Sequence, residues 1–593
     1  MSVRALDAGA GGAARRWPRG LPVLLLGLAF AHNAALSWRK WGDLYVDVGR
    51  ELELPSQILA GRLLYGDLRF YYGPLGPYVN ALLYRLFGVH VGVLVGAGLV
   101  SAALMTVVLY RLARRFVDRP MATVTAGSFL YLCAFAHLSP PSIFNFVLPY
   151  TYSATYGMLA AAASLYFLLR HVARGRRRDQ VLALGALVLA ALAKVEVLVP
   201  ALLAHAAYAA WACARGRAQR LATIAAYAIA AGLVLGVYGG FRLAVGPALL
   251  TDNLGGVLNP QAAFYISGVM GTRDPLASLA HVALSAALLG LTVLAAYALA
   301  SRLRAPLGAV AAMAAAGIVY ARLPIMLSLR GLPVLIAAML AADAHRWWRG
   351  AEPGERVLPR VLVLLFAAGS LGRIALNAAA AEYGFYLLPV SLVVVALLWT
   401  VYAPHWLPRI EARRGLSLAG HGLLLGLIVA HLQVSYVFYA AHTVRVEGPR
   451  GRLDLIARFP SGLPWGDAHA EVLRLLRTLP PGTRVLTIPQ GVGLVFFSGL
   501  AYPYRMFSYV PPEWSGRFDD ARIVADWAAA PPDVIVVEQG NVSAVEFGSR
   551  GFGVDHGQAA ARWIEANYEP WAAIAYLRVL TRRGFERPAR VSG

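Results

Sequence analysis

The sequence predicts an α-helical integral membrane protein of about thirteen transmembrane helices, with a large first extracytoplasmic loop and a small C-terminal α/β domain. Three observations predict this fold class. Hydrophobic residues make up 59% of the 593 residues and charged residues 14%, which is too little charge to cover a soluble surface. Apolar stretches of nearly membrane-spanning length recur from the first span to about residue 441. Residues 443–593 instead combine short apolar runs with amphipathic patterns.

Each predicted span follows from an apolar stretch of bilayer length. The spans are about 21–37, 91–110, 121–138, 147–169, a helical hairpin within 181–213, 221–245, 280–300, 307–320, 331–344, 359–376, 385–402 and 416–441. Lys194-Val-Glu196 interrupts the hairpin and is expected at its outer tip. We interpret the first span as a retained signal-anchor rather than a cleaved signal peptide.

Arginine clusters predict the orientation of these spans. They occupy every second connection, at Arg15–Arg16, Arg111–Arg115, Arg174–Arg178, Arg215–Arg220, Arg302–Arg304, His345–Arg349 and Arg409–Arg414. Because Lys and Arg remain on the cytoplasmic side, residues 1–20 are predicted to be cytoplasmic. The membrane domain then covers 21–442, with its first loop, 38–90, outside. Clusters this short, between apolar spans, do not indicate a nucleic-acid surface despite the net charge of +23.

The C-terminal region, 443–593, is predicted to be one small extracytoplasmic domain. A polar linker and an amphipathic helix fill 454–482, and 484–489 and 533–539 have the composition of short buried strands. Residues 521–532 and 561–574 have helical patterns. The glycine-rich stretches 491–499 and 547–553 lack the strand–loop–helix context of a nucleotide fingerprint, so we interpret both as turns.

The first loop concentrates acidic residues in a chain that has only 31 of them. Asp47 and Glu51 are four residues apart and would share one face of a helix, with Asp43 one turn earlier on the same side. Carboxylates grouped at a membrane interface suit a general base that acts on a hydroxyl nucleophile. A solvated acidic loop is the alternative interpretation.

The same loop carries a motif that resembles a known family. It reads acidic-x-Gly, Gly-x-x-x-Tyr-x-Asp, Tyr-Gly-Pro-Leu, Pro-Tyr and Phe-Gly in order. The matching positions are Asp47, Gly49, Gly61, Tyr65, Asp67, Tyr72, Gly73, Pro74, Leu75, Pro77, Tyr78, Phe87 and Gly88. This pattern resembles the first outer loop of the polytopic GT-C glycosyltransferases, in particular the family-39-type and aminoarabinose-transferase-like branch. The second outer loop and the hairpin tip resemble that group more weakly.

The resemblance implies an inverting glycosyltransferase of the bacterial plasma membrane. Such an enzyme takes a sugar from a polyprenyl-phosphate carrier in the membrane and transfers it to an extracytoplasmic glycan, lipid or protein. It places the general base on Asp47, with Asp43 as the competing candidate. Many relatives have a second acid directly after the first, whereas Val48 stands here. The helper carboxylate is therefore expected at Glu51.

Cationic residues near the outer ends of spans are an exception to the positive-inside pattern. Lys194, Arg322, Arg330 and Arg373 could bind the donor phosphate and stabilise it as it leaves. Snorkelling, or pairing of Lys194 with Glu196, is the alternative.

The substrate groove is expected to involve Asp67, Tyr72, Tyr78, Tyr152 and Tyr386. An aromatic belt at the membrane interface is the other interpretation of these tyrosines.

No His, Asp and Glu set has convincing metal-ligand spacing, so no metal site is predicted, although a divalent metal stays possible. The two cysteines, Cys133 and Cys213, lie in apolar spans and do not indicate a disulfide framework. The rival function is a transporter or flippase for a lipid-linked or amphipathic solute. Transporters usually bury charge near the bilayer midplane, whereas these charges gather at predicted outer surfaces. A lipid-linked-glycan ligase or polymerase and a non-catalytic scaffold are further alternatives.

Overall fold

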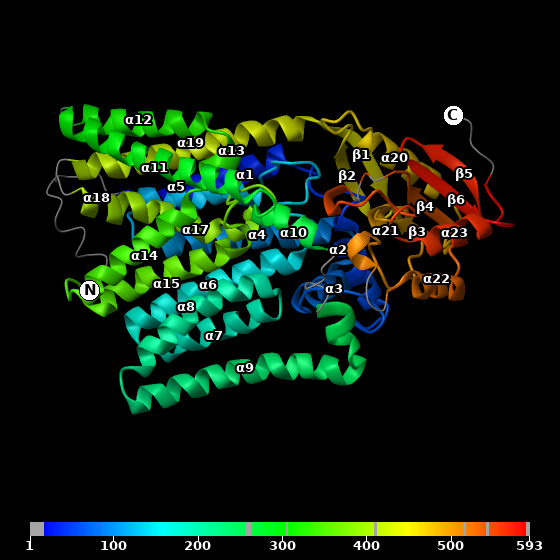
Figure 1. The fold of residues 1–593 in the computed structure, drawn as a ribbon, viewed down its shortest axis with the longest axis horizontal. Helices are drawn as coiled ribbons and strands as arrows, with labels where there is room; N and C mark the ends of the chain where they lie inside the picture. The colour runs from blue at the N-terminus through cyan, green and yellow to red at the C-terminus, as the bar shows by residue number, and fades with distance from the viewer. Residues whose placement is uncertain are drawn as a thin grey trace.

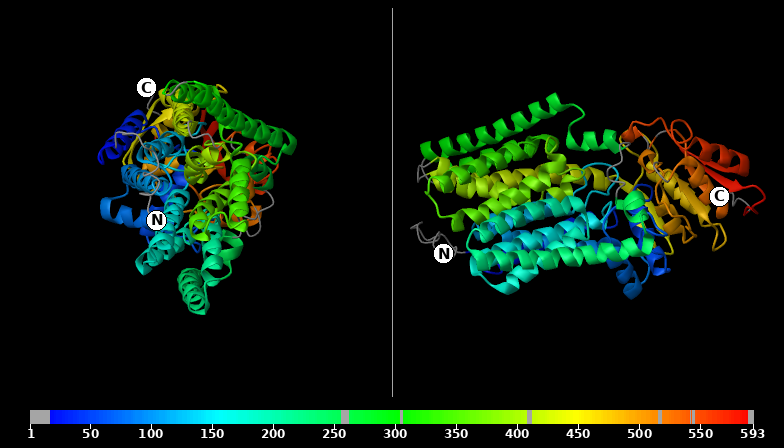
Figure 2. Two further views of the ribbon diagram at one scale, coloured as in Figure 1. Left: turned by 90° about the vertical axis from the view of Figure 1, so that its left-hand side faces the viewer. Right: turned by 60° about the horizontal axis from the view of Figure 1, so that its bottom comes forward.

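The computed structural model describes residues 17–254, 262–303, 306–407, 412–514, 518–540, 542 and 545–588. A bundle of long helices occupies one part of an elongated molecule, and the C-terminal strands lie beyond one end of that bundle (Figures 1 and 2). The predicted cytoplasmic residues Arg15, Arg16, Arg304 and Arg409 lie outside the described residues.

Nine helical segments in the described part of the chain are long and apolar enough to cross a membrane. They are α4 (Val91–Ala113), α6 (Tyr152–Arg174), α8 (Val195–Cys213), α9 (Arg217–Val245), α10 with α11 (Ala263–Met270, Pro275–Arg302), α13 with α14 (Ile325–Ser328, Leu332–Trp348), α15 with η6 (Gly354–Leu371, Gly372–Ile374), α17 with η7 and α18 (Pro389–Leu397, Leu398–Tyr402, Ala403–Trp406) and α19 (Arg413–Ala440). The protein is therefore a multi-pass membrane protein, as predicted.

Shorter helices complete the bundle. They are α1 (Leu21–Leu36), α5 (Arg119–Phe129) continued by η2 (Leu130–Ala134), α7 (Arg177–Ala191) and α12 (Leu307–Arg322). Local sequence sets where several helices begin. Asp118 accepts a hydrogen bond from the backbone N–H of Met121 at the start of α5, and Asp274 does the same for Ala277 at α11. Proline follows within the first two positions of both helices, where its missing N–H costs nothing.

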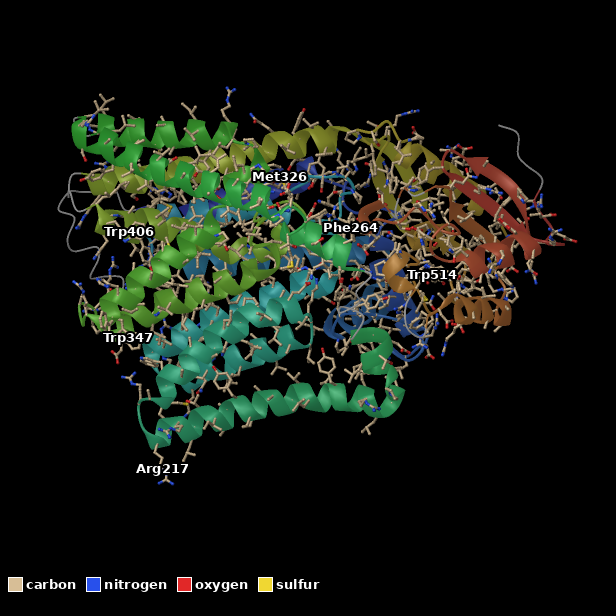
Figure 3. All side chains as sticks on the ribbon, viewed as in Figure 1. Arg217, Phe264, Met326, Trp347, Trp406 and Trp514 are labelled. Carbon is tan, nitrogen blue, oxygen red and sulfur yellow. The ribbon has the colours of Figure 1, made fainter. Side chains whose placement is uncertain are left out.

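The two ends of the bundle differ in character. Arg217, Trp347 and Trp406 lie at the end remote from the C-terminal strands, whereas Phe264 lies near the C-terminal domain (Figure 3). Basic residues occupy the helix connections at that remote end, as in the last turns of α6 and α14. Arginine clusters and the C-terminal domain are thus on opposite sides of the apolar bundle.

The first loop folds into two helices, α2 (Val48–Leu59) and α3 (Leu75–Phe87), at the end of the bundle that faces the C-terminal domain (Figure 1). Helix α2 buries most of its length and packs against α21 (Val492–Ser498). A Cβ atom on Gly49 would lie 2.1 Å from the backbone nitrogen of Gly493, so the two backbones meet where no side chain fits.

The C-terminal domain has two sheets. An antiparallel hairpin joins β1 (His442–Gly448) to β2 (Gly451–Ile456). A mixed sheet has the order β3-β4-β6-β5, from strands Val485–Ile488, Val534–Glu538, Leu577–Arg582 and Tyr568–Ile574, with only β3 and β4 parallel. Its helices are α20 (Trp465–Leu476), α21, α22 (Asp520–Ala529) and α23 (Gln558–Asn567).

The structure corrects three local predictions in this domain. Residues 492–498 form helix α21 rather than a turn, and its residues up to Phe497 are buried. The predicted helix over 561–574 ends at Asn567, and 568–574 form strand β5, because pairing with β6 overrides the local helical pattern. The linker predicted near residue 454 contains β2, whose partner β1 begins directly after α19.

Candidate functional site

Buried and half-buried charged side chains gather where the helix ends, the first loop and the C-terminal domain meet. Lys194 caps helix α8, Glu196 lies in the first turn of that helix, and η6 supplies Arg373. The first loop supplies Asp47, Arg50 and Glu51. Tyrosines from three connections fill the space around them.

Lys194 lies at the N-cap position of α8 with its side chain 3% exposed. Its ammonium donates hydrogen bonds to the hydroxyls of Tyr150 at 2.5 Å and Tyr386 at 3.3 Å, and it forms an ion pair with Glu196. The amine also lies 4.6 Å from the ring centre of Tyr72. A cation at a helix N-terminus adds to the positive end of the helix dipole, so this corner has a strong attraction for anions.

Glu196 joins the two cations of this corner. Its Oε1 is 2.6 Å from Arg373 Nη1, and its Oε2 accepts a hydrogen bond of 2.8 Å from the Tyr386 hydroxyl. The Arg373 guanidinium lies 4.9 Å from the ring centre of Tyr383. In this state one carboxylate pairs with both Lys194 and Arg373.

Asp47 directly precedes α2 in an unusual backbone conformation. Its φ is +47°, in the left-handed region that residues other than glycine rarely adopt. Its side chain is 32% exposed, and Oδ1 is 3.1 Å from Nη1 of Arg50. Strained residues of this kind persist where the surrounding structure imposes them, and they cluster at functional sites.

Glu51 lies in the first turn of α2 but does not share the exposure of Asp47. It is buried, its Oε2 accepts the backbone N–H of Tyr152 at 2.9 Å, and Oε1 is 3.5 Å from Arg50. Burial raises the pKa of the Glu51 carboxyl. With these contacts Glu51 orients the Arg50 side chain, and Arg50 in turn orients the Asp47 carboxylate.

The expectation that Asp43 lies on the same helical face is wrong, because α2 begins at Val48 and Asp43 lies in the preceding loop. The Asp43 carboxylate is buried and points into the C-terminal domain, where Oδ2 accepts a 2.6 Å hydrogen bond from the Trp465 indole. Asp43 therefore does not stand beside Asp47 as a second base.

Arg50 connects the acidic and basic clusters. Its Nη2 donates to the backbone carbonyl of Tyr150 at 3.0 Å, and its guanidinium lies 6.0 Å from the ring centre of Tyr72. Tyr150 and Tyr72 also contact Lys194. Asp47 and the Lys194–Glu196–Arg373 cluster are therefore neighbours across one layer of tyrosines.

Other predicted site residues lie elsewhere. Asp67 accepts the backbone N–H of Leu63, and the Tyr78 ring is tilted against Phe241 on α9. The buried Tyr152 donates to the carbonyls of Leu94 and Val147, as a structural residue would.

The outer arginines also differ from the expectation. Arg330 donates to Asn377 and contacts His281, and Arg322 ends α12. The structure brings Lys194 and Arg373 together with Asp47, and it brings neither Arg330 nor Arg322 into these contacts.

The sequence patterns did not single out Arg50 or Glu546. Arg50 could have been found because it stands between the candidate acids Asp47 and Glu51. Glu546 lies in η10 (Val545–Phe547) of the C-terminal domain, whose Phe547 ring packs 5.4 Å from that of Tyr265 in α10. Tyr265 in turn shares a 2.6 Å hydrogen bond with Tyr383 beside Arg373. No local pattern in the sequence relates position 546 to this corner.

We expect the docking of η10 against α10 to depend on pH through Glu546. Desolvation at this junction, followed by the charges of Asp47 and Glu382, raises the pKa of Glu546 to about 7. Because the docked state holds the proton more tightly, its stability is greatest below about pH 4.5 and falls as the pH rises through about 7. We expect the protection of the 262–270 amides, after correction for the intrinsic rise of exchange with pH, to be lower at pH 8 than at pH 5. Glu546→Gln should remove that difference, and an unchanged pH dependence in this variant would contradict the assignment.

The donor set does not indicate a metal centre. Within the described ranges, no group of three or more His, Cys, Asp or Glu residues is placed to hold a metal ion. The carboxylates nearest the site, Asp47, Glu51 and Glu196, each pair with an arginine or a lysine.

Fold and site together define a multi-pass membrane protein with a largely buried charged cluster at the junction between its helix ends and a C-terminal α/β domain. No family model and no curated protein matches the sequence. The structure of ArnT from Cupriavidus metallidurans bound to undecaprenyl phosphate aligns over 96% of this chain and 100% of its own, with 15% identity and a TM-score of 0.47. Archaeal oligosaccharyltransferase AglB from Archaeoglobus fulgidus, in complex with an inhibitory peptide and a dolichol-phosphate, aligns over 96% of this chain and 75% of its own, with 12% identity and a TM-score of 0.42.

Proposed function

We propose that this protein is a GT-C glycosyltransferase that moves a sugar from a polyprenyl-phosphate carrier to an acceptor on the extracytoplasmic face. The observation that carries the proposal is the adjacency of two groups in one corner. A partly exposed carboxylate, Asp47, lies beside a paired lysine and arginine at the N-terminus of α8. The carboxylate suits a hydroxyl acceptor, and the two cations suit a phosphate. The motif of the first loop supports the same assignment.

The proposed reaction is a single displacement. Asp47 takes the proton of the acceptor hydroxyl while that oxygen attacks the anomeric carbon of the donor sugar. The bond between this carbon and the phosphate oxygen breaks, and its electron pair leaves on the phosphate. The configuration at carbon inverts, and the carrier leaves as a phosphate monoester.

Lys194 and Arg373 would stabilise the negative charge that develops on this phosphate. Both cations are already held in place by Glu196 and the tyrosine hydroxyls, so little reorganisation is needed when the charge appears. In the free protein Glu196 occupies the position of an anion between them. Release of the polyprenyl phosphate is then assisted, because the Glu196 carboxylate can form its ion pairs with both cations again.

The orientation follows from the two ends of the bundle. The basic connections would remain cytoplasmic, which places the charged corner and residues 443–593 outside. This is the side where a lipid-linked donor, rather than a cytoplasmic nucleotide sugar, would be available. Reporter fusions within 38–90 and after residue 443 test this arrangement, and a cytoplasmic signal from either position would overturn it.

The central experiment uses the purified full-length chain in proteoliposomes with a radiolabelled polyprenyl-phosphate sugar and an extract of envelope glycans and lipids as acceptors. Transfer of label with release of polyprenyl phosphate is the expected result. Movement of the intact labelled donor between leaflets without transfer would favour the flippase alternative. The absence of both would reject the enzymatic proposal for the donors tested.

A further inference from the structure

The segment that carries Asp47 is held by the C-terminal domain as well as by the membrane domain, whose Ser142 carbonyl accepts the Gly42 N–H at 2.6 Å. The backbone N–H of Gly491 donates to the carbonyl of Tyr45 at 2.8 Å, and the Tyr45 hydroxyl donates to the carbonyl of Ile488 at 3.3 Å. The Tyr45 ring is stacked on His469 with centroids 5.1 Å apart, and it meets Trp465 edge to face at 5.5 Å. Residues more than 400 positions away thus form the walls around this loop.

The Asp43 carboxylate fixes the loop before Asp47 through hydrogen bonds on both of its oxygens. One carboxylate oxygen accepts the backbone N–H groups of Tyr45 at 2.7 Å and Val46 at 3.0 Å, which closes a tight turn. The other oxygen accepts the Trp465 indole N–H at 2.6 Å. A buried carboxylate with all its partners fixed specifies one arrangement, because losing any partner leaves a polar group unsatisfied away from water.

The loop is closed from the other side by a contact between two glycines. A Cβ on Gly493 would lie 2.4 Å from the carbonyl oxygen of Leu44, and one on Gly49 would meet Gly493 just as closely. Asp47 lies between these two contact points, with Tyr45 on one side and Gly49 on the other. Two ion pairs, Glu53 with Arg450 at 2.9 Å and Arg69 with Glu513 at 3.1 Å, extend the attachment along the loop.

These contacts explain how Asp47 keeps its positive φ. A left-handed conformation at a residue other than glycine is maintained only where the surroundings over-determine it. Within the described part of the chain, the backbone on the N-terminal side of Asp47 is bound by the Asp43–Trp465 pair, and the C-terminal side is pressed against α21. The loop before α6 holds both ends of the segment, through the Ser142 carbonyl that accepts the Gly42 N–H and the Tyr150 carbonyl that accepts from Arg50. The hydrogen bonds of Asp43 and Tyr45 given above that leave the segment go to the C-terminal domain.

We propose that the C-terminal α/β domain is the positioning element of the site, and that Trp465 and Gly493 are positioning residues that hold the Asp47 carboxylate in its working geometry. The predicted effect on the rate of sugar transfer rests on the proposed function, whereas the predicted effect on the conformation of residues 42–49 does not. A displacement of about 1 Å at a reacting group can cost on the order of 100-fold in rate. The domain therefore acts on the reaction without supplying a reacting group.

The test compares two tryptophan variants of the full-length protein in proteoliposomes. Trp465→Phe removes the indole donor to Asp43 and keeps an aromatic ring against Phe459 and Tyr576, which stack on it. Trp527→Phe is the matched control, because Trp527 is equally buried in the same domain and donates its N–H to Tyr509 instead. Hydrogen exchange of 42–49 and steady-state transfer are measured for both.

We expect Trp465→Phe to speed exchange in 42–49 and to lower kcat for transfer by about 10-fold or more, with KM for the donor unchanged. Trp527→Phe should change neither quantity. Equal exchange in 42–49 for the two variants would overturn the positioning role. An equal loss of kcat in both variants would mean that the loss reflects the general stability of the domain. That result would also overturn the positioning role.

Gly493→Ala provides a second, independent perturbation. Its Cβ would push against the Leu44 carbonyl, so we expect the same faster exchange and the same loss in kcat without loss of donor binding. Gly236→Ala, inside helix α9 with open space around its Cβ and no positive φ, tests for general effects of the substitution. If Asp47→Asn were fully active, the proposed base would be wrong, yet the exchange result would still decide whether the domain positions the loop.

Discussion

Asp47→Asn is expected to lower the rate of sugar transfer by about 100- to 10,000-fold, the range typical for loss of a general base. The amide has nearly the same shape and can still contact Arg50, but it cannot take up the acceptor proton. Donor binding should stay near the level of the unaltered protein, because the phosphate is proposed to contact Lys194 and Arg373. Proteoliposome transfer assays and separate donor-binding measurements distinguish the two effects.

Asp67→Asn is the matched control for this experiment. Asp67 belongs to the same loop and the same motif, but its carboxylate accepts the backbone N–H of Leu63, a bond that an asparagine oxygen can replace. We expect this variant to retain transfer. Full activity in Asp47→Asn, or an equal loss in both variants, would show that the base has been assigned to the wrong residue.

Arg373→Gln and Lys194→Met are expected to weaken binding of the donor and of polyprenyl phosphate by about 10- to 100-fold each. This range corresponds to the loss of one charge-assisted hydrogen bond of about 1.5–3 kcal/mol. The reason is that Glu196 would neutralise the remaining cation and leave little positive charge for the phosphate. Binding of labelled polyprenyl phosphate to the purified variants measures the effect without requiring turnover.

Arg322→Gln serves as the comparison for charge alone. Arg322 ends α12, which packs chiefly on α11 and α19 rather than on α8. Its removal should leave binding unchanged. If Arg322→Gln weakened binding as much as Arg373→Gln, the phosphate would be responding to net charge at the interface, and the proposed pocket would be wrong.

Much of the architecture could be predicted from local sequence. Span positions and the helical hairpin around Lys194 follow from the apolar length of each stretch, because a bilayer excludes unpaired backbone polar groups and so requires helices of that length. Strands β3 and β4 were predictable for a similar reason, since both are short and fully or nearly buried. Strand β5 was not, because its pairing with β6 outweighs the helical pattern that continues from α23.

The site, too, is only partly predictable from local sequence. Composition, the outer ends of the spans and the first-loop motif by themselves determined a membrane protein with a set of candidate charged residues, because these features depend on residue type and short spacing. The candidates were the acids Asp47, Asp43 and Glu51 and the cations Lys194, Arg373, Arg322 and Arg330. Only the tertiary structure decided that Asp43 faces Trp465 instead of the site, and that Arg50 and Glu196 join several of the candidates into one cluster. Those contacts link residues up to about 420 positions apart. Local pattern carries no information about which distant side chain will satisfy a buried charge, so the folded chain alone could assign these partners.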